Sequence, residues 1–309
     1  MLYLNRIHWL LALIVLTSHS IHAKQSFEMK RDDDSTIHYY LEQRGQPNLL
    51  VLLQGSDCNS VDQNTTINEK FASYFQQTDI LTVEKYGITS ELSWDRNPER
   101  DDCPPHYLSH DSPQQRVSDY KQVITFIAEQ KHYQSIILLG GSEGALVANM
   151  LATQSHLVDG VVALNAGGQF FLNDILHSIE AEVPVEARTQ ALGGFKKFAE
   201  QIQQSDQMDI VVSGHGFKWW KQSLSTDQLN ILHQIYAPVL LIQSELDTNV
   251  DPHSAAVLVD EVLQSKSNID FRLYPSVDHY FIDKQGVNHT IDILKLINQW
   301  LSAKKLLED

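Results

Sequence analysis

The chain has 309 residues, of which 42% are hydrophobic and 20% charged, and its formal net charge at pH 7 is −16. These fractions exclude wholesale disorder, and the length suits one large α/β domain or one domain with an insertion. The negative charge excludes binding to nucleic acid or to an anionic membrane surface through bulk electrostatic attraction.

The first 23 residues have the layout of a targeting segment. One early basic residue, Arg6, precedes an apolar run, and small and polar residues then lead to Ala23. This order is typical of a secretory signal peptide, and the apolar run is too short to span a bilayer comfortably. The sequence predicts a signal peptide over residues 1–23, with an uncleaved anchor as the alternative. The mature protein is then expected in the periplasm or outside the cell, without membrane contact.

The chain contains two cysteines, Cys58 and Cys103. In an exported protein a lone pair more often forms a disulfide than a metal site, because two sulfurs alone cannot complete a tetrahedral shell. We therefore predict a disulfide between them, worth about 4 kcal/mol in chain entropy.

The mature chain opens with elements of a sheet. Two semi-alternating runs flank residues 32–35 and predict a β-hairpin. The continuous apolar run at residues 48–55 predicts a strand that is covered on both faces, and a weaker run follows at residues 79–87. Residues 88–111 are polar, contain several prolines and have no regular period, which predicts a long loop.

A helix is predicted over residues 111–130. Ser112 suits the N-cap, Pro113 suits the first helical position, and Gln115 completes a capping box. The next strand, helix and strand are expected at residues 135–141, 143–154 and 160–168.

The regular alternation stops between residues 169 and 236, a mostly helical and polar segment that predicts an inserted cap. It then resumes with a strand, a helix, a strand and a helix, at residues 237–247, 252–264, 269–275 and 290–307. Strands that alternate with helices predict an α/β fold with a mostly parallel sheet, helices on both faces and the hairpin as an antiparallel edge. The core is expected to comprise residues 24–168 and 237–309, with the cap at 169–236.

A Gly-x-Ser-x-Gly motif at Gly140, Ser142 and Gly144 lies directly between a predicted strand and a predicted helix. That is the context of a nucleophile elbow, in which the glycines leave room for a strained serine backbone. A nucleotide-binding turn needs Gly-x-Gly-x-x-Gly or a lysine-bearing phosphate loop, and neither sequence is present here.

Two further residues follow in the order serine, acid, histidine: Asp247 after a late predicted strand and His279 after the last one. With these residues the sequence resembles the α/β-hydrolase superfamily over residues 26–304. The resemblance implies that Ser142 is the nucleophile, His279 the general base and acid, and Asp247 the group that orients the histidine.

The chain departs from the family pattern at two positions, where Ser244 and Ser276 replace usual glycines. Alternatives to the acid and to the histidine stay open on sequence alone: Asp251, Glu245, His289 and His253.

The oxyanion of an acyl-transfer reaction needs N–H donors. The resemblance implies the backbone N–H of Glu143, directly after the nucleophile, and that of Ser56 in the loop after an early strand. Five further residues are candidates to line the substrate site: Trp94, Arg96, Phe217, Trp219 and Trp220. The alternative is that the three aromatic residues of the cap form its core and that the two loop residues are solvated at the surface.

These residues predict an exported serine hydrolase that cleaves an ester or amide bond in a small molecule or short peptide, with no metal and no cofactor. The GGSEG form of the elbow resembles those of the prolyl-oligopeptidase and serine-aminopeptidase branches as well as those of esterases. A serine peptidase is therefore one alternative, for which acidic cap residues would bind a free amine: Glu180, Glu182 and Glu186. A non-catalytic, ligand-binding member of the fold is the other, and the sequence leaves the oligomeric state open.

Overall fold

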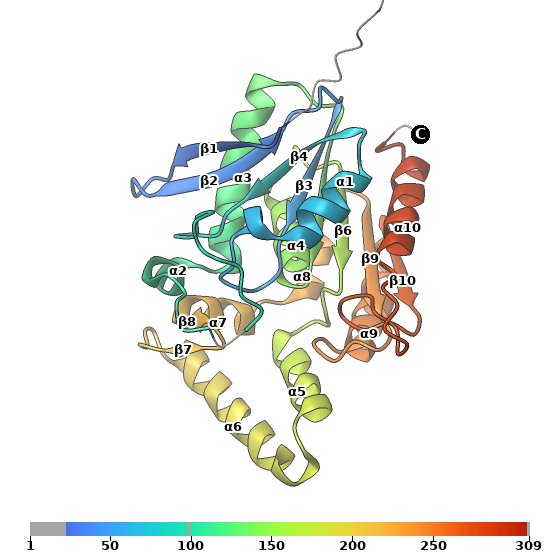
Figure 1. Cartoon of the computed structure of the whole chain (residues 1–309). Coiled ribbons are helices and arrows are strands. Elements are labelled where there is room, and N and C mark those ends of the chain that lie inside the picture. Colours follow the sequence, from blue (N-terminus) through green and yellow to red (C-terminus); the bar gives the residue numbers. More distant parts are fainter. Residues whose placement is uncertain (1–22, 98–99, 308–309) are drawn as a thin grey trace, which may run out of the picture.

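The fold is taken from a computed structural model, which describes residues 23–97 and 100–307 (Figure 1). The predicted signal peptide lies outside the described residues, apart from its last position, Ala23.

A central sheet of eight strands, in the order β1-β2-β4-β3-β5-β6-β9-β10, organises the described part of the chain (Figure 1). The strands β1 and β2 form an antiparallel hairpin at one edge, β2 pairs antiparallel with β4, and the other neighbours are parallel. This confirms the predicted sheet. The bounds are β1 (Gln25–Lys30), β2 (Thr36–Glu42), β3 (Asn48–Leu53), β4 (Thr78–Val83), β5 (Ser135–Gly141), β6 (Gly160–Leu164), β9 (Val239–Ser244) and β10 (Ile269–Tyr274).

Helices cover both faces of this sheet, which explains why its central strands β3, β5 and β6 are almost entirely apolar. In β3, Leu49, Val51 and Leu53 face one core cluster, whereas Leu50 and Leu52 face another. The first cluster also contains side chains of α3 (Pro113–Gln130), α4 (Glu143–Gln154), α8 (Gln228–Gln234) and α9 (Pro252–Val262). The second contains side chains of α10 (Thr290–Ala303), of α1 (Ala72–Tyr74) and of the helical turn Thr66–Phe71, which follows the short turn Val61–Gln63.

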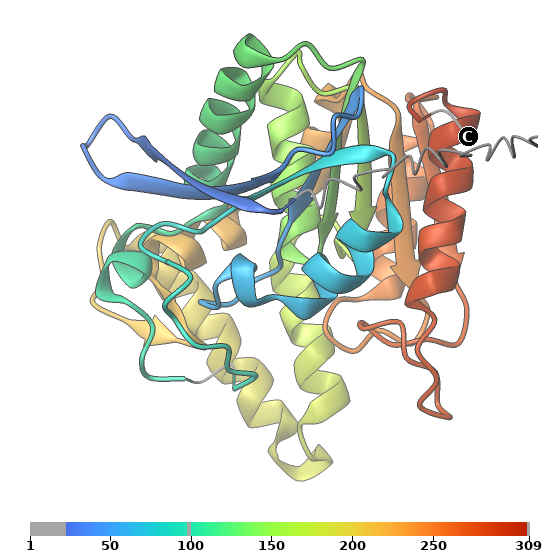
Figure 2. The same cartoon turned by 45° about the horizontal axis from the view of Figure 1, so that its top comes forward.

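The cap elements lie between β6 and β9. The helices α5 and α6 form a hairpin that projects from the body, and Figure 2 shows the same projection from a second direction. A small aromatic core holds α6 and α7 together through Trp219 and Trp220. The limits of the cap at residues 169 and 236 stay a prediction. The bounds are α5 (Phe171–Glu182), α6 (Val185–Gln204), β7 (Val211–Val212), β8 (His215–Gly216) and α7 (Phe217–Ser225).

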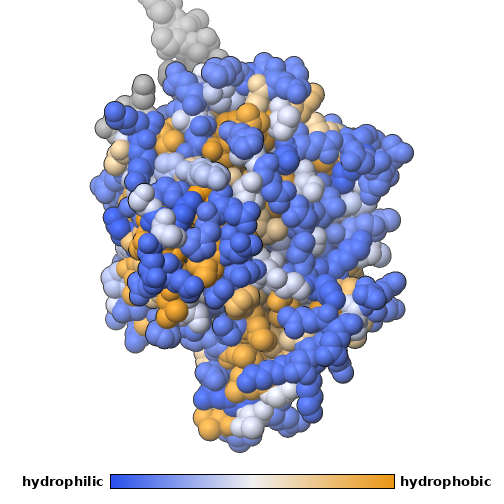
Figure 3. All heavy atoms as spheres, turned by 180° about the vertical axis from the view of Figure 1, so that it is seen from behind, coloured by the Kyte–Doolittle hydropathy of each residue, from blue (hydrophilic) through white to orange (hydrophobic). Residues whose placement is uncertain are grey.

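Seen from behind, most of the surface is hydrophilic, and hydrophobic residues gather toward the bottom, where the α5–α6 hairpin meets the body (Figure 3). Phe170 at the base of this hairpin is 40% exposed, and Val185 at its turn is 73% exposed. Among the described helices, none is long and apolar enough to cross a membrane.

Two local predictions need correction. The segment 88–111 is not irregular throughout, because α2 (Pro105–His110) begins at a proline in the first helical position, where no N–H is needed. The capping box of α3 is only half formed. Ser112 Oγ accepts from the Gln115 N–H at 3.2 Å, but the Gln115 side chain donates instead to Asp119 Oδ1 at 2.9 Å.

The predicted disulfide is present between Cys58, in the loop after β3, and Cys103, just before α2, with 5.8 Å between their Cα atoms. It packs in a small buried cluster with Ile88 and Tyr107. The loop that carries Ser56 is therefore tied covalently to α2.

Candidate active site

The backbone of Ser142 is strained. It connects the end of β5 to the start of α4 with φ of 55° and ψ of −126°, a backbone conformation that residues other than glycine rarely adopt. Its N–H donates to the carbonyl oxygen of Leu164, at the end of β6, at 2.8 Å. The turn therefore holds the serine outward at the carboxyl edge of the parallel strands, where α/β folds place their sites.

The two flanking glycines make this turn possible. A Cβ on Gly140 would collide with the backbone carbonyl of Gly144, and a Cβ on Gly144 would collide with the carbonyl of Leu53 in β3. At Gly141, by contrast, nothing lies within 4 Å of an added Cβ. The spacing of the motif thus follows from backbone contacts at its two outer positions.

Asp247 and His279 form a close pair. Asp247, in the loop after β9, is 2% exposed, and its Oδ2 lies 2.7 Å from Nδ1 of His279, in the loop after β10. Its Oδ1 accepts the N–H groups of Asn249 and Val250 at 2.9 and 3.1 Å, and Gln243 Nε2 donates to Oδ2 at 3.1 Å. A carboxylate only accepts, so His279 carries its proton on Nδ1 and keeps Nε2 as the basic nitrogen.

The alternatives to this pair are engaged elsewhere. Asp251 caps α9 and accepts from the N–H of His253, and Glu245 accepts from the N–H of Ser276. His289 pairs with Asp283 at 3.0 Å. Of the acids and histidines that the sequence analysis considered, Asp247 and His279 are the two that the described residues join as a pair at the carboxyl edge of the sheet.

Asn165, which the sequence analysis missed, connects the end of β6 to the histidine loop and to the end of β9. Its Nδ2 donates to the carbonyl oxygen of His279 at 2.9 Å, and its Oδ1 accepts from the N–H of Ser244 at 2.8 Å. Within the described residues no hydrogen bond joins Ser142 Oγ directly to His279. Such contacts are often long without substrate and tighten when substrate binds.

The two predicted oxyanion donors both line the pocket that contains Ser142. Neither the Glu143 nor the Ser56 backbone N–H donates to another described residue. Gly55, just before Ser56, approaches closely enough that a Cβ there would lie 3.5 Å from the Ser142 Cβ. Two unpaired N–H groups therefore flank the serine.

The pocket over Ser142 has a volume of about 480 Å³ and is built by core and cap together. Leu146 and Val250 come from the core, and Phe171, Asp174 and Trp219 come from the cap helices. Most of its wall surface is apolar, although seven of its twelve lining residues carry polar side chains.

Beneath the elbow, the carboxylate of Glu143 has two buried partners. Arg116 donates to its Oε1 at 3.0 Å, and Trp219 Nε1 donates to its Oε2 at 2.9 Å. Burial alone would raise the pKa of Glu143, but the guanidinium of Arg116 and neighbouring cations hold that pKa below its usual value. Arg116 also donates to the carbonyl oxygen of Gln54 at 2.6 Å, so one cation contacts both the elbow and the Ser56 loop.

The same cluster contains a neutral histidine and an unpaired acid. His215 stacks on Trp219 with ring centroids 3.7 Å apart, its Nδ1 lies 3.0 Å from the Tyr107 hydroxyl, and burial lowers its pKa to about 4. Neither carboxyl oxygen of the buried Asp111 has a hydrogen-bond partner among the described residues. Burial, and then repulsion from Glu143, raise the pKa of Asp111 to about 7.

The predicted substrate-lining residues divide into two groups. Trp219 lines the Ser142 pocket, whereas Phe217 and Trp220 pack in the cap core. Trp94 and Arg96 are exposed in the long loop and do not line the pocket. Sequence reasoning missed several other residues of this pocket, among them the acid Asp174, for which no motif gave a signal.

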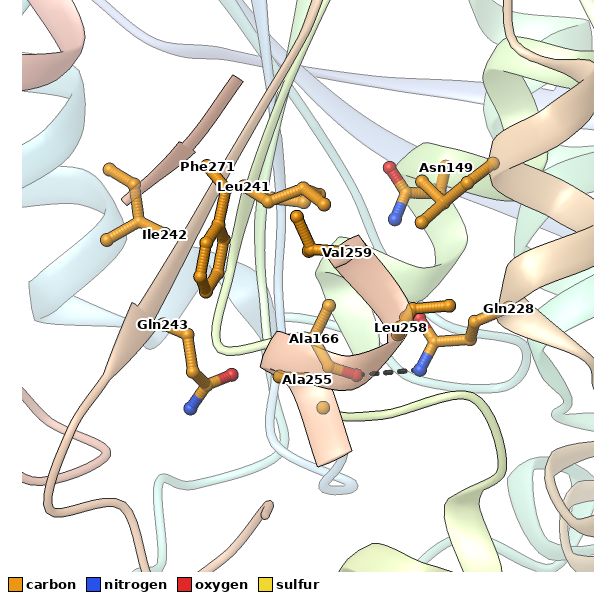
Figure 4. Close-up of a pocket in the computed structure, with 13 residues that line it drawn as sticks. Asn149, Ala166, Gln228, Leu241, Ile242, Gln243, Ala255, Leu258, Val259 and Phe271 are labelled. Atoms are coloured by element: carbon orange, nitrogen blue, oxygen red, sulfur yellow. Dashed lines mark hydrogen bonds between the residues drawn. The ribbon is translucent and has the colours of Figure 1, made fainter. Parts of the chain in front are cut away.

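A second cavity, of about 300 Å³, lies between the sheet and the helices α4, α8 and α9 (Figure 4). Gln228 spans one side and donates to the carbonyl oxygen of Ala166 at 2.9 Å. Neither side-chain amide atom of Asn149, on another wall, has a partner among the described residues. Gln228 and Ala166 also line the Ser142 pocket, so the two hollows share a wall.

Part of the chain matches a known protein family in sequence. The model of the prolyl oligopeptidase family matches residues 177–304, a range that includes Asp247 and His279 but not Ser142. No curated protein sequence matches the chain.

Solved structures are similar in fold. An esterase of Pyrococcus furiosus has a TM-score of 0.63 and 12% identity, with 91% of each chain covered. Est1E from Butyrivibrio proteoclasticus has a TM-score of 0.59 and 10% identity, covering 91% of this chain and 99% of that one. The acylaminoacyl peptidase of Pyrococcus horikoshii has a TM-score of 0.59 and 13% identity, covering 91% of this chain and 41% of that one.

The chain has the α/β-hydrolase fold.

Proposed function

We propose that the protein is an exported serine hydrolase that cleaves an ester bond through an acyl-enzyme formed on Ser142. The observation that carries the proposal is the 2.7 Å contact between His279 and the buried Asp247, at the same edge of the sheet as the strained Ser142. Esterases among the structural neighbours are consistent with this chemistry.

In the proposed reaction, His279 Nε2 takes the proton of the Ser142 hydroxyl while its oxygen attacks the substrate carbonyl carbon. The N–H groups of Glu143 and Ser56 bind the oxyanion that forms. His279 then gives the proton to the departing alcohol as the carbon–oxygen bond breaks, which leaves an ester on Ser142. Water, deprotonated by the same nitrogen, attacks that ester. His279 then returns the proton to Ser142 Oγ as the bond between the acyl carbon and that oxygen breaks, and the acid is released.

Asp247 orients the ring and stabilises the imidazolium that forms in each half of the reaction. Its three further donors, from Gln243, Asn249 and Val250, hold the carboxylate in place. Each oxyanion donor is expected to contribute about 3 kcal/mol of transition-state stabilisation.

A serine peptidase is the second candidate, because the family match is to prolyl oligopeptidases. The chemistry at Ser142 would be the same, with an amine as the leaving group. Export is supported by the predicted signal peptide and by the Cys58–Cys103 disulfide, a bond that persists in oxidising compartments.

The test is labelling of the purified, disulfide-intact protein with a fluorophosphonate, read by intact mass, beside Ser142→Ala. We expect a single adduct that the substitution abolishes. A matched series of p-nitrophenyl esters and p-nitroanilides then distinguishes esterase from peptidase. An unlabelled, folded wild type would contradict the hydrolase, and labelling that survives in Ser142→Ala would contradict the choice of nucleophile.

A further inference from the structure

Asp174 lies in the first turn of the cap helix α5 and is 1% exposed. Its Oδ1 accepts two backbone N–H groups, from Gly168 at 3.2 Å and from Asp251 at 2.9 Å. These bonds tie the base of the cap to the loop after β6 and to the start of α9. An asparagine at this position would accept the same two bonds, so this structural task needs no charge.

The same side chain lines the pocket that contains Ser142. Its other oxygen, Oδ2, accepts no hydrogen bond from a described residue, and no described Lys, Arg or His lies within ion-pair distance of the carboxyl group. Burial, and then the nearby Asp251 and Asp247, raise its pKa to about 7. A carboxyl group is thus held in a mostly apolar pocket without a cation of the protein to balance it.

Burying an ionised carboxylate costs free energy unless a cation accompanies it. At neutral pH and above, a cationic ligand would therefore pair with the carboxylate of Asp174 and offset the cost of burying its charge. The side chains of Phe171 and Trp219 line the same pocket. A neutral acyl chain would leave the carboxylate unpaired.

We propose that Asp174 binds a primary ammonium group of the substrate, so that the enzyme selects esters or amides of amino-bearing acids. The inference rests on the proposed function for its chemical step, but ammonium binding is a separate property of the pocket. The exposed acids of the cap, such as Glu180, take no part, because water already solvates them.

The selectivity depends on pH through Asp174. The titratable groups that face it from the packed elements are Asp251 at the start of α9, Asp247 after β9 and His177 on α5 itself. His177 lies 2.9 Å from the Asp247 carbonyl oxygen and 3.8 Å from the Asp251 carboxylate. As pH rises through about 7, Asp174 ionises, and preference for an ammonium substrate over its neutral analogue increases. The ratio of the two rates cancels any pH dependence that the two reactions share.

The kinetic experiment compares p-nitrophenyl 6-aminohexanoate with p-nitrophenyl hexanoate, and leucine p-nitroanilide with 4-methylpentanoyl p-nitroanilide. Wild type is expected to prefer the ammonium member of a pair by tenfold or more, and Asp174→Asn to lose about tenfold of that preference. Glu180→Gln, on the same helix, is the matched control and is expected to behave as wild type. Fluorophosphonate labelling at Ser142 verifies that each variant keeps its nucleophile.

A binding experiment separates this inference from the proposed function. Leucinamide and 4-methylpentanamide are titrated by calorimetry into Ser142→Ala, with and without Asp174→Asn. We expect the amine to bind more tightly than its neutral analogue only when Asp174 is present. Equal binding of the two amides, or a preference that survives Asp174→Asn, overturns the inference whatever the labelling result. Ammonium binding by an enzyme that no fluorophosphonate labels would instead overturn the hydrolase and leave Asp174 as a ligand site.

Discussion

Trp219 Nε1 donates a hydrogen bond of 2.9 Å to Glu143 Oε2, and so connects the cap helix α7 to the residue directly after Ser142. The backbone N–H of Glu143 is the first predicted oxyanion donor, and its side chain is held by Trp219 on one oxygen and Arg116 on the other. The position of the cap and the position of this donor are therefore linked through one side chain.

Trp219→Phe removes the indole donor and leaves a buried carboxylate oxygen unpaired. Loss of a hydrogen bond to a charged group costs about 1.5–3 kcal/mol, so we expect fluorophosphonate labelling of Ser142 to slow by roughly tenfold or more. Trp220→Phe is the matched control, because Trp220 lies in the same helix and donates to the Val212 carbonyl oxygen instead. Equal slowing in both variants would point to general loosening of the cap.

Gly144→Ala should prevent the elbow from forming. The added methyl group meets the carbonyl of Leu53 in the central sheet, so either the strand or the turn must move, at an expected cost of about 3 kcal/mol or more. Gly141→Ala, three positions earlier, meets nothing and is expected to change stability by less than about 1 kcal/mol. Urea unfolding of the two variants, followed by circular dichroism, measures the difference.

Asp247→Asn is expected to lower kcat by about four orders of magnitude while the fold is retained, because an amide can hold His279 in the wrong tautomer. Asp251→Asn changes a carboxylate that caps α9 and is expected to leave kcat within about tenfold of wild type. Both values come from steady-state ester hydrolysis. A large loss in Asp251→Asn and a small one in Asp247→Asn would exchange the roles of the two acids.

The buried acid Asp111 should make stability depend on pH. Its folded pKa of about 7 lies above the ordinary value of 3.8, so the folded state binds the proton more tightly than the unfolded state does. Stability therefore falls as pH rises from about 4 to 7 and is constant above that range. Asp111→Asn removes this loss, and its stability relative to wild type is expected to rise by on the order of 3 kcal/mol between pH 4 and pH 8.

Urea unfolding at several pH values measures that change. Asp174 titrates in the same range in both proteins and cancels in the difference. A difference between the two proteins that stays constant from pH 4 to pH 8 would contradict the raised pKa of Asp111.

The sheet could be predicted from the sequence because its strands are marked by composition alone. A strand buried on both faces is largely apolar, and β5 and β6 are nearly unbroken apolar runs that are followed by or end at glycine or asparagine. The elbow was equally visible, since its two glycines are required by contacts within and next to the turn. Asp247 after β9 and His279 after β10 could be predicted from the order serine, acid, histidine along the chain.

The surroundings of the site could not be predicted in this way. Asp174 and Arg116 look like ordinary polar residues of amphipathic helices, and only the packing of those helices buries their charges. Asn165 occupies a positive-φ turn whose partners, Ser244 and His279, are remote in sequence. Such contacts depend on tertiary placement, which no local period encodes. The helix α2 was missed for a simpler reason, because prolines that often break helices here begin one.

The disulfide has a consequence that reaches beyond its own two sulfurs. From Cys103 the chain enters α2, where Tyr107 contacts His215, which stacks on Trp219, which bonds Glu143. The other sulfur belongs to the loop of Ser56. Ser56 and Glu143, whose N–H groups are proposed to bind one oxyanion, are therefore connected through the disulfide, α2, His215 and Trp219. Arg116 joins the same two segments through Gln54 and Glu143, so the spacing of the two N–H groups depends on several links together.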